Sequence, residues 1–353
     1  MRALTVTPGT AGSLAVAEMP DPEPIDGELL VDGLAVGICG TDREIAAAEY
    51  GFAPPGESLL VLGHESLGRV REAPPGSDFS RGDLVAGVVR RPDPQPCGAC
   101  AHGEFDMCRN GGYTERGIKE LHGYASEVWT VPQDYAVRLD PALAEVGVLL
   151  EPTSVVAKAW EQVERVGGRA WFEPRTALVT GAGPIGLLAA LLGTQRGLDV
   201  HVLDRVTEGL KPELVRDLGA TYHSDPVDDV LDRLRPDVVV EATGVAQIVL
   251  AAMAGTAPYG IVCLTGVSGI GRKIDVDAGS LNRDIVLEND VVVGSVNANL
   301  RHWAAAAHAL AAADVEWLSR LITRRLPLAD FADAFEPRPD DVKVVLDLQA
   351  SRA

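Results

Sequence analysis

The sequence predicts an α/β protein that combines a doubly wound parallel sheet with a second domain rich in β-strands. Residues 176–296 alternate apolar runs with helical stretches, the pattern of a parallel sheet covered by helices. Residues 1–90 instead contain short strands separated by turn-forming residues such as the loop at 20–24. A chain of 353 residues is long enough for two domains, each with its own core.

The parallel part begins with a strand, a glycine turn, a helix and a second strand within residues 176–205. An apolar run at 177–179 precedes the glycine turn at 181–186, and a helical pattern follows to residue 196. Gly197 is expected to end that helix because glycine tolerates positive φ. A second apolar run, at 200–203, ends at Asp204. Later apolar runs at 237–244, 260–266 and 291–294 predict further strands, the last of them buried because its residues are β-branched.

This glycine turn has the order and context of a dinucleotide-binding site. Gly181 permits the tight turn, Gly183 lets a pyrophosphate approach the backbone, and Gly186 lets helix and strand pack closely. The helix start offers free N–H groups to the pyrophosphate, and Asp204 would accept hydrogen bonds from a ribose 2′-OH. The expected cofactor-binding residues are Gly181, Gly183, Pro184, Ile185, Gly186, Asp204, Arg205, Thr243 and Asn297.

Composition excludes several classes of function. The net charge of −20 argues against a nucleic-acid or anionic-membrane surface, and favours a solvated acidic exterior. The sequence contains no apolar stretch long enough to span a membrane, and its start lacks the apolar core of a signal peptide. Five cysteines in a chain of this kind favour metal ligands or core residues over disulfides, so we expect a cytoplasmic protein.

Two short segments of the first domain carry good zinc ligands. Cys39 lies in the segment 37–42, and His64 and Glu65 lie in the segment 63–68. Cysteine and histidine bind zinc well, and glutamate is a usable ligand. Because the segments are far apart in sequence, their spacing leaves open a core role for Cys39 and a hydrogen-bonded one for His64.

Together with the glycine turn, these segments resemble the zinc-dependent medium-chain alcohol dehydrogenase superfamily. The resemblance covers essentially the whole chain, including residues 82–85, 328–335 and 343–346. A narrower similarity is to the archaeal-type glucose dehydrogenases, and it rests on residues 88–92, 114–118, 121–124, 150–152 and 294–297. The resemblance implies a GroES-like catalytic domain at residues 1–160 and 298–353, and a Rossmann cofactor domain at 161–297.

The resemblance also implies a site. Cys39, His64 and Glu151 match the catalytic-zinc ligands, with Glu65 as a further or exchanging ligand, although Glu151 alone could be an acid at a helix start. Thr41 would pass a proton outward, unless it only caps a turn. Cys97, Cys100 and Cys108 match three of four structural-zinc ligands, with Pro94 at the place of the first, so that Asp93 and His102 are the candidates for the fourth. Glu115, Asn297 and His302 match positions that contact the sugar.

The function implied is hydride transfer from a hydroxyl of a sugar or polyol to NAD(P), most simply from glucose to give the lactone. Asp204 favours NAD over NADP, although Arg205 would tolerate some NADP. A biosynthetic dehydrogenase of a cyclitol or amino sugar is an alternative. A zinc-free reductase or a non-catalytic dinucleotide-binding relative is an alternative of another class. The expected partners are a small sugar or polyol and a second copy of the chain, in a homodimer or homotetramer.

Overall fold

The computed structural model describes residues 1–269 and 273–349, and the chain folds as two units. Unit 1 comprises Met1–Ser154 and Ala298–Ala353, and unit 2 comprises Val155–Asn297. The first unit is therefore discontinuous in sequence. The boundary expected at residues 160/161 falls inside helix α3 (Leu150–Gly167), six residues after the division at Ser154.

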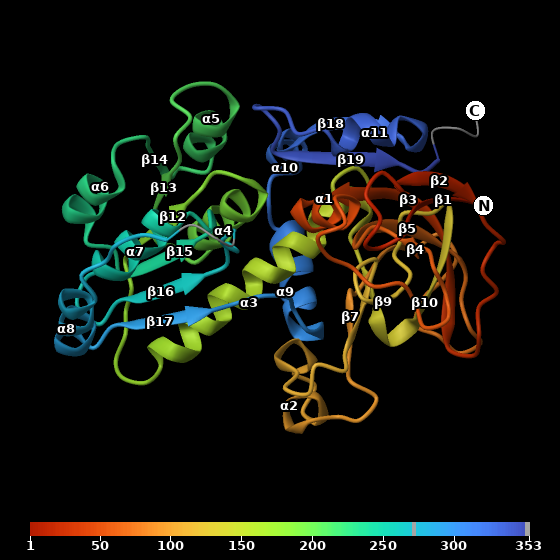
Figure 1. The fold of residues 1–353 in the computed structure, drawn as a ribbon, viewed down its shortest axis with the longest axis horizontal. Coiled ribbons are helices and arrows are strands. Elements are labelled where there is room, and N and C mark those ends of the chain that lie inside the picture. The colour runs from red at the N-terminus through yellow and green to blue at the C-terminus, as the bar shows by residue number, and fades with distance from the viewer. Residues whose placement is uncertain (270–272, 350–353) are drawn as a thin grey trace. The chain divides into compact units, whose positions relative to one another are not determined.

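Unit 1 is built mainly of β-strands (Figure 1). Its strands are β1 (Arg2–Val6), β2 (Ala15–Glu18), β3 (Glu28–Ile38), β4 (Leu60–Val61), β5 (Glu65–Glu72), β6 (Leu84–Gly87), β7 (Arg90–Arg91), β8 (Thr114–Arg116), β9 (Glu120–Leu121), β10 (Val128–Pro132), β11 (Ala136–Arg138), β18 (Ile322–Pro327) and β19 (Lys343–Asp347). Its helices are α1 (Gly40–Ala46), α2 (Gly98–Ala101), α9 (Leu300–Ala311), α10 (Val315–Leu321) and α11 (Phe331–Phe335).

The largest sheet of unit 1 joins the two ends of the chain. Its strand order is β11-β6-β5-β3-β19-β18, and β10 also pairs with β3. The long strand β3 pairs antiparallel with β5 on one side and with the C-terminal strand β19 on the other. A buried cluster that includes Leu29, Val31, Tyr124 and Trp129 packs against this sheet. The residues at the starts of β5 and β19 are thereby brought to opposite sides of the end of β3.

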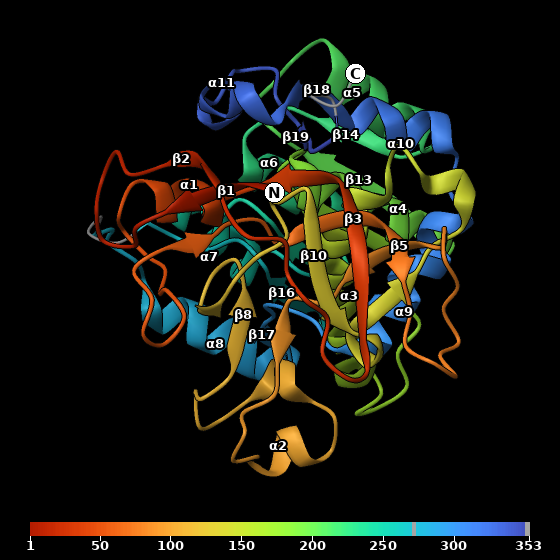
Figure 2. The same ribbon diagram turned by 90° about the vertical axis from the view of Figure 1, so that its right-hand side faces the viewer.

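The short helix α2 belongs to a lobe that projects away from these sheets (Figure 2). The lobe follows β7 and includes the 3₁₀ turn Phe105–Met107. It contains all three closely spaced cysteines, at positions 97, 100 and 108.

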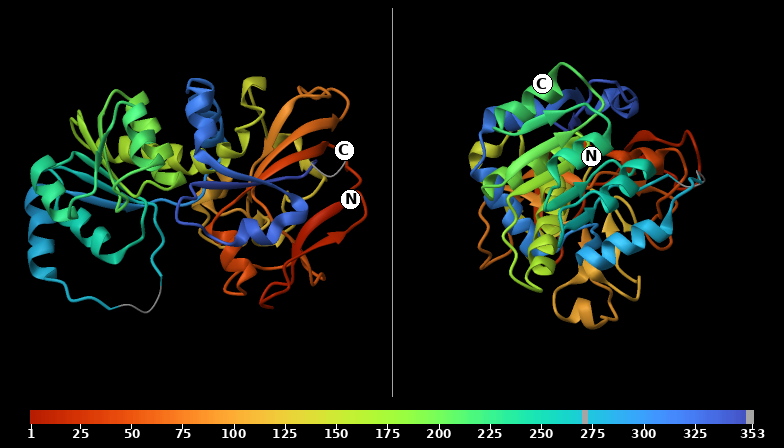
Figure 3. Two further views of the ribbon diagram at one scale, coloured as in Figure 1. Left: turned by 90° about the horizontal axis from the view of Figure 1, so that it is seen from above. Right: turned by 90° about the vertical axis from the view of Figure 1, so that its left-hand side faces the viewer.

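Unit 2 is a six-stranded parallel sheet with helices on both faces (Figures 1 and 3). Its strands are β12 (Thr176–Thr180), β13 (Asp199–Leu203), β14 (Thr221–His223), β15 (Val238–Glu241), β16 (Ile261–Leu264) and β17 (Val291–Gly294), in the order β14-β13-β12-β15-β16-β17. Its further helices are α4 (Pro184–Gln195), α5 (Leu210–Asp217), α6 (Val227–Leu234), α7 (Ala246–Ala254) and α8 (Ala278–Glu288). The order reverses between β12 and β15, which is the switch point of a Rossmann fold, and the predicted fold class is confirmed.

The glycine turn has the geometry that its sequence predicts. Gly181 has φ of 92° and Gly197 has φ of 77°, both in the region that favours glycine. A Cβ atom on Gly186 would lie 1.7 Å from the Gly181 carbonyl oxygen, so only glycine fits there. A Cβ atom on Gly183 would meet no atom within 4 Å, so the space beside Gly183 is open to a ligand.

The last strand, β17, is less buried than its apolar sequence predicts. Val291, Val292 and Val293 are each partly exposed because β17 lies at the edge of the sheet and pairs only with β16 within the described residues. The other two predicted strands, β15 and β16, are mostly buried, and Cys263 in β16 is fully buried. None of the helices within residues 1–269 and 273–349 has the length and apolarity needed to cross a membrane.

Candidate functional site

Unit 1 brings Cys39, His64 and Glu65 into one cluster. Cys39 is the N-cap of α1, His64 lies in the turn before β5, and Glu65 is the first residue of β5. One potential ligand atom from each of the three lies within 4.8 Å of the others. The shortest of these contacts joins Cys39 Sγ and His64 Nε2 at 3.0 Å. The structure therefore gathers a thiol, an imidazole and a carboxylate, which is a zinc-type donor set.

Asp42 supports this cluster from the first turn of α1. Its fully buried carboxylate accepts a hydrogen bond from the Cys39 backbone N–H at 3.0 Å and lies 3.5 Å from His64 Nδ1. Burial opposes the charge on the His64 ring, but Cys39 and Asp42 raise the pKa of His64 well above its ordinary value. A carboxylate beside the second ring nitrogen fixes the orientation of a metal-binding histidine.

Glu65 is held by a buried cation from the far end of the chain. Lys343 Nζ, at the start of β19, donates to both Glu65 carboxylate oxygens, at 2.6 and 2.7 Å. The two side chains are only 3% and 2% exposed. Gly37 lies beneath this pair, and a Cβ atom there would be 2.0 Å from Glu65 Oε2. Glu65 is thus fixed by an ion pair as well as lying close to Cys39 and His64.

Glu151 lies outside the 4.8 Å cluster but within its electrostatic reach. It is in the first turn of α3 and is half-buried. Burial raises the pKa of Glu151 to about 7, with His64 lowering it and Glu65 raising it.

The cluster has more acids than bases. Cys39, Asp42, Glu65 and Glu151 face two cationic groups, His64 and Lys343. Burial raises the pKa of Cys39 and that of Glu151, and a divalent cation would favour the deprotonated, ligating forms of both, so the residues present fit a zinc ion.

Two of these supporting residues were not assigned a role from the sequence. Asp42 lies three residues after Cys39, the spacing at which a side chain can bond back to the N-cap N–H, so a capping signal was available. Lys343 had no usable signal, because only the β3–β19 pairing places it beside Glu65. Thr41, which was predicted to be catalytic, is half-buried in α1 next to Asp42.

The three cysteines of the projecting lobe form a second cluster. Potential ligand atoms of Cys97, Cys100 and Cys108 lie within 4.8 Å of one another. Backbone N–H groups of Cys100 and Arg109 lower the pKa of the Cys97 thiol to about 6, which favours the metal-binding thiolate.

Neither candidate for a fourth ligand belongs to this cluster of sulfur atoms. Asp93 accepts a hydrogen bond from the Gln95 N–H at 2.8 Å. The exposed His102 has its Nδ1 atom 2.7 Å from the Gly98 carbonyl oxygen.

A buried polar network contains Glu115 and His302. Arg90 Nε donates to Glu115 Oε1 at 3.0 Å, and Arg90 Nη1 donates to the Asp106 carbonyl at 3.0 Å. The Asp106 side chain accepts from Asn299 Nδ2 at 2.6 Å, and His302 Nδ1 accepts from the Asn299 N–H at 3.1 Å. The network therefore connects β7 and β8 to the start of α9. His302, which the sequence resemblance matches to a sugar-binding position, is 1% exposed and takes part in the capping box at the start of α9.

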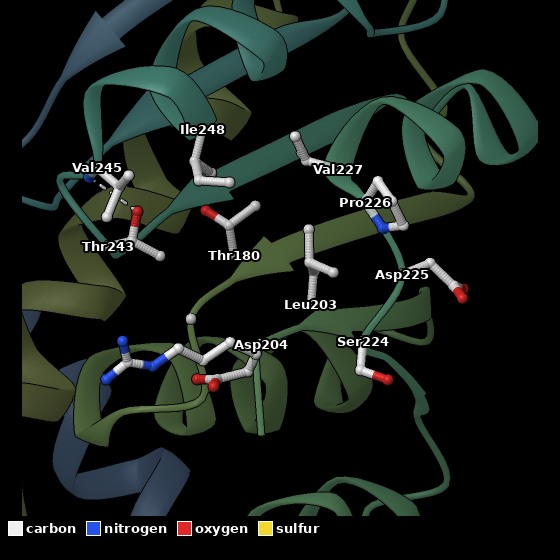
Figure 4. A pocket seen from close by; sticks show the side chains of 12 residues that line it. Thr180, Leu203, Asp204, Ser224, Asp225, Pro226, Val227, Thr243, Val245 and Ile248 are labelled. Carbon is white, nitrogen blue, oxygen red and sulfur yellow. Dashed lines mark hydrogen bonds between the residues drawn. The ribbon is translucent and has the colours of Figure 1, made fainter. Parts of the chain in front are cut away.

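Unit 2 contains a cavity of about 710 Å³ at the carboxyl ends of its strands (Figure 4). Leu203, Val227 and Ile248 lie around the same space and give it an apolar wall that suits a flat base. Of the predicted cofactor residues, the lining includes Gly181, Asp204, Arg205 and Thr243. The sequence did not point to Thr180, Leu203, Ser224, Asp225, Pro226, Val227, Val245 and Ile248, which also line it.

Asp204 links this cavity to the glycine turn. Its carboxylate accepts hydrogen bonds from the Ala182 N–H at 2.6 Å and from the Val206 N–H at 3.2 Å. The remaining lone pairs of a carboxylate suffice for a ribose hydroxyl as well. Gly183, Pro184, Ile185 and Gly186 form the turn and the start of α4 beside it. Asn297 follows β17, with a φ of 61°.

Comparison with known proteins identifies relatives that match almost the whole chain. A family model described as alcohol dehydrogenase GroES-like domain matches residues 25–141, and one described as glucose dehydrogenase C-terminus matches residues 144–348. Glucose 1-dehydrogenase of Methanocella arvoryzae is 40% identical over 361 residues, which cover 99% of this chain and 100% of that protein. Glucose 1-dehydrogenase of Thermoproteus tenax is 42% identical over 357 residues, with 99% and 100% covered.

A solved structure extends the likeness to three dimensions. It is the glucose dehydrogenase of Haloferax mediterranei in complex with NADP, Zn and gluconolactone. It matches with a TM-score of 0.90 and 36% identity, over 98% of this chain and 99% of that one. The resemblance stated from the sequence motifs is confirmed: the chain belongs to the glucose dehydrogenase family of the medium-chain alcohol dehydrogenases.

Proposed function

We propose that the protein is a zinc-dependent dehydrogenase that oxidises the anomeric hydroxyl of an aldose, with glucose giving the lactone, and transfers the hydride to NAD(P). The observation that supports this proposal most strongly is the cluster of Cys39, His64 and Glu65, a zinc-type donor set, on a chain that matches a glucose dehydrogenase over 99% of its length. A zinc-free reductase would have no need of this donor set, and a non-catalytic relative would have no need to retain it.

Cys39, His64 and Glu151 would hold the catalytic zinc. Glu65, which lies in the cluster with Cys39 and His64, would be an alternative ligand if it moved away from Lys343. Zinc supplies Lewis-acid chemistry when bound, making a substrate hydroxyl easier to deprotonate. Asp42 keeps the His64 ring oriented, and its position beside Nδ1 leaves Nε2 facing Cys39. Thr41, adjacent to Asp42 on α1, offers a hydroxyl that can pass the released proton towards solvent.

The sugar is recognised by polar groups that the fold holds in place. Glu115, held in place by Arg90, would accept hydrogen bonds from sugar hydroxyls. Asn297 supplies an amide, and His302 supports the site through the Asn299 and Asp106 network. A polar site discriminates against analogues that lack hydroxyl groups, because its own buried groups would be left unpaired.

The dinucleotide binds in unit 2, with its pyrophosphate at the glycine turn and its adenosine in the cavity beside Asp204. NAD is preferred over NADP, because Asp204 accepts from a ribose 2′-OH. Comparing kcat/KM for the two cofactors tests this preference, and a clear advantage for NADP would contradict it. Cys97, Cys100 and Cys108 hold a second, structural zinc, for which Asp93 or His102 would have to change its side-chain position to complete four ligands.

The protein works as a homodimer or homotetramer in the cytoplasm. The edge strand β17 leaves one side unpaired within the described residues, and Val286 and Leu287 on α8 are 63% and 65% exposed. These features suit pairing with a second copy of the chain. Five free cysteines suit a reducing compartment. Light scattering of the wild type and of a Val292→Lys variant tests the interface, and an unchanged mass for the variant would contradict it.

A substrate panel tests the reaction itself. Aldoses, cyclitols, amino sugars and simple alcohols are compared by the absorbance of reduced nicotinamide, at equal zinc content. Glucose or a close aldose is expected to give the highest kcat/KM. A cyclitol or amino sugar as the best substrate would replace the aldose assignment, and no turnover with any of them would refute dehydrogenase function.

A further inference from the structure

Lys211 lies beside the carboxylate that is expected to choose between NAD and NADP. It is in the first turn of α5, and its Nζ atom is 3.8 Å from Asp204 Oδ2. The side chains are 18% and 12% exposed, so water screens the pair only partly. The sequence indicated Asp204 and Arg205 at this position and gave Lys211 no role.

The charge of the Asp204 carboxylate is partly compensated by hydrogen-bond donors. Oδ2 accepts from the Ala182 N–H, and Oδ1 accepts from the Val206 N–H, so both oxygens already have donors. Tyr222 donates to the Val206 carbonyl and so supports the same turn. With two N–H dipoles and an ammonium group against it, the Asp204 carboxylate repels a neighbouring phosphate less than its formal charge suggests.

The second acidic residue that lines the cavity is also paired with a cation. Asp225 lines the cavity and is paired with Arg233 at 3.2 Å. Arg205 lines it with an exposed side chain. Two cations therefore lie at the edge where the ribose 2′ position would meet Asp204. Arg205 lines the cavity itself, and Lys211 approaches Asp204 from α5.

We propose that Lys211 is a specificity-determining residue for the cofactor, which offsets Asp204 and allows the site to accept a 2′-phosphate as well as a free 2′-hydroxyl. The inference rests on the proposed dinucleotide-dependent function. Lys211 would thus let a site that prefers NAD also accept NADP, whose 2′-phosphate would be bound through Lys211 and Arg205. Asp204 keeps its backbone bonds in both cases, so the glycine turn retains its shape.

The test measures binding without turnover, using adenosine 5′-monophosphate and adenosine 2′,5′-bisphosphate as probes in calorimetry at low salt. Lys211→Met should weaken the bisphosphate relative to the monophosphate by about tenfold, the effect of one unit charge at about 7 Å in a partly screened setting. Lys211→Arg should restore most of the ratio. Arg216→Met, which removes an exposed cation from the same helix, should leave the ratio unchanged.

Two results would overturn the inference. An unchanged ratio in Lys211→Met would exclude a role in cofactor choice, and an equal change in Arg216→Met would assign the effect to net charge alone. Either result would leave the proposed dehydrogenase function standing. Failure of both probes to bind the wild type would instead refute the dinucleotide site, and the inference with it.

Discussion

Replacing Lys343 with methionine should destabilise the protein by about 3–5 kcal/mol, because it leaves the buried Glu65 carboxylate without its cation. Lys343 Nζ lies 2.6 and 2.7 Å from the two Glu65 oxygens, and both side chains are almost fully buried. Methionine is close to lysine in length and would leave no large cavity. Most of the loss in unfolding free energy would therefore come from the unpaired Glu65 charge.

Two further variants isolate this ion pair. The double variant Glu65→Gln/Lys343→Met removes both charges and should be more stable than Lys343→Met. With the single variant Glu65→Gln it completes a double-mutant cycle, whose coupling energy should be about 2 kcal/mol or more. Arg71→Met removes a cation from the partly exposed pair with Asp32, which also links β5 to β3, and should cost about 1 kcal/mol.

The assay is urea unfolding followed by tryptophan fluorescence and far-ultraviolet circular dichroism, with the change in free energy taken from the midpoint shift. The same samples are analysed for zinc, because a displaced Glu65 disturbs the cluster with Cys39 and His64. A loss below about 1 kcal/mol for Lys343→Met, or a double variant less stable than the single one, would refute the reasoning.

The remaining predictions concern the cofactor turn, the cysteine lobe and the sugar. Gly186→Ala should lower stability by several kcal/mol, on the order of a strong overpacking cost, because its Cβ would meet the Gly181 carbonyl, whereas Gly183→Ala should keep stability and weaken dinucleotide binding. Thermal unfolding and calorimetry separate the two, and equal losses of stability would count against the assigned roles. Cys100→Ala should remove one zinc per chain and lower Tm while the other zinc remains, by elemental analysis. Glu115→Gln should lower kcat/KM for the sugar by roughly 10- to 100-fold, on the cost of one unpaired buried group, with cofactor affinity nearly unchanged; a proportional loss of cofactor affinity would contradict a sugar contact.

Much of unit 2 was predictable from the sequence because its signals are local. Gly181 is required by its positive φ and Gly186 by the nearby Gly181 carbonyl oxygen, and Asp204 follows directly on an apolar run. Strand, turn and acid could therefore be placed without knowing the fold. The edge strand β17 was the exception. Its valines have the composition of a buried strand, but strand order decides exposure, and order is not a local property.

The site in unit 1 was only partly predictable, because its contacts join distant segments. The pairing of β3 with β5 and β19 brings Glu65 to Lys343 across 278 positions in the chain. His302 was matched to a sugar-binding position, and the structure adds that its buried side chain accepts a hydrogen bond at the start of α9, a contact that the matched motif did not indicate. The resemblance to a family supplied the ligand types, and the structure supplied the charges that hold them.

The most direct test of the account compares glucose oxidation by metal-depleted and zinc-reconstituted enzyme, with zinc content and reduced nicotinamide measured on the same samples. The account predicts that activity vanishes on depletion, returns in proportion to the first zinc bound at the Cys39 and His64 cluster, and does not return in Cys39→Ser. Full activity with glucose in enzyme that contains no metal would contradict it.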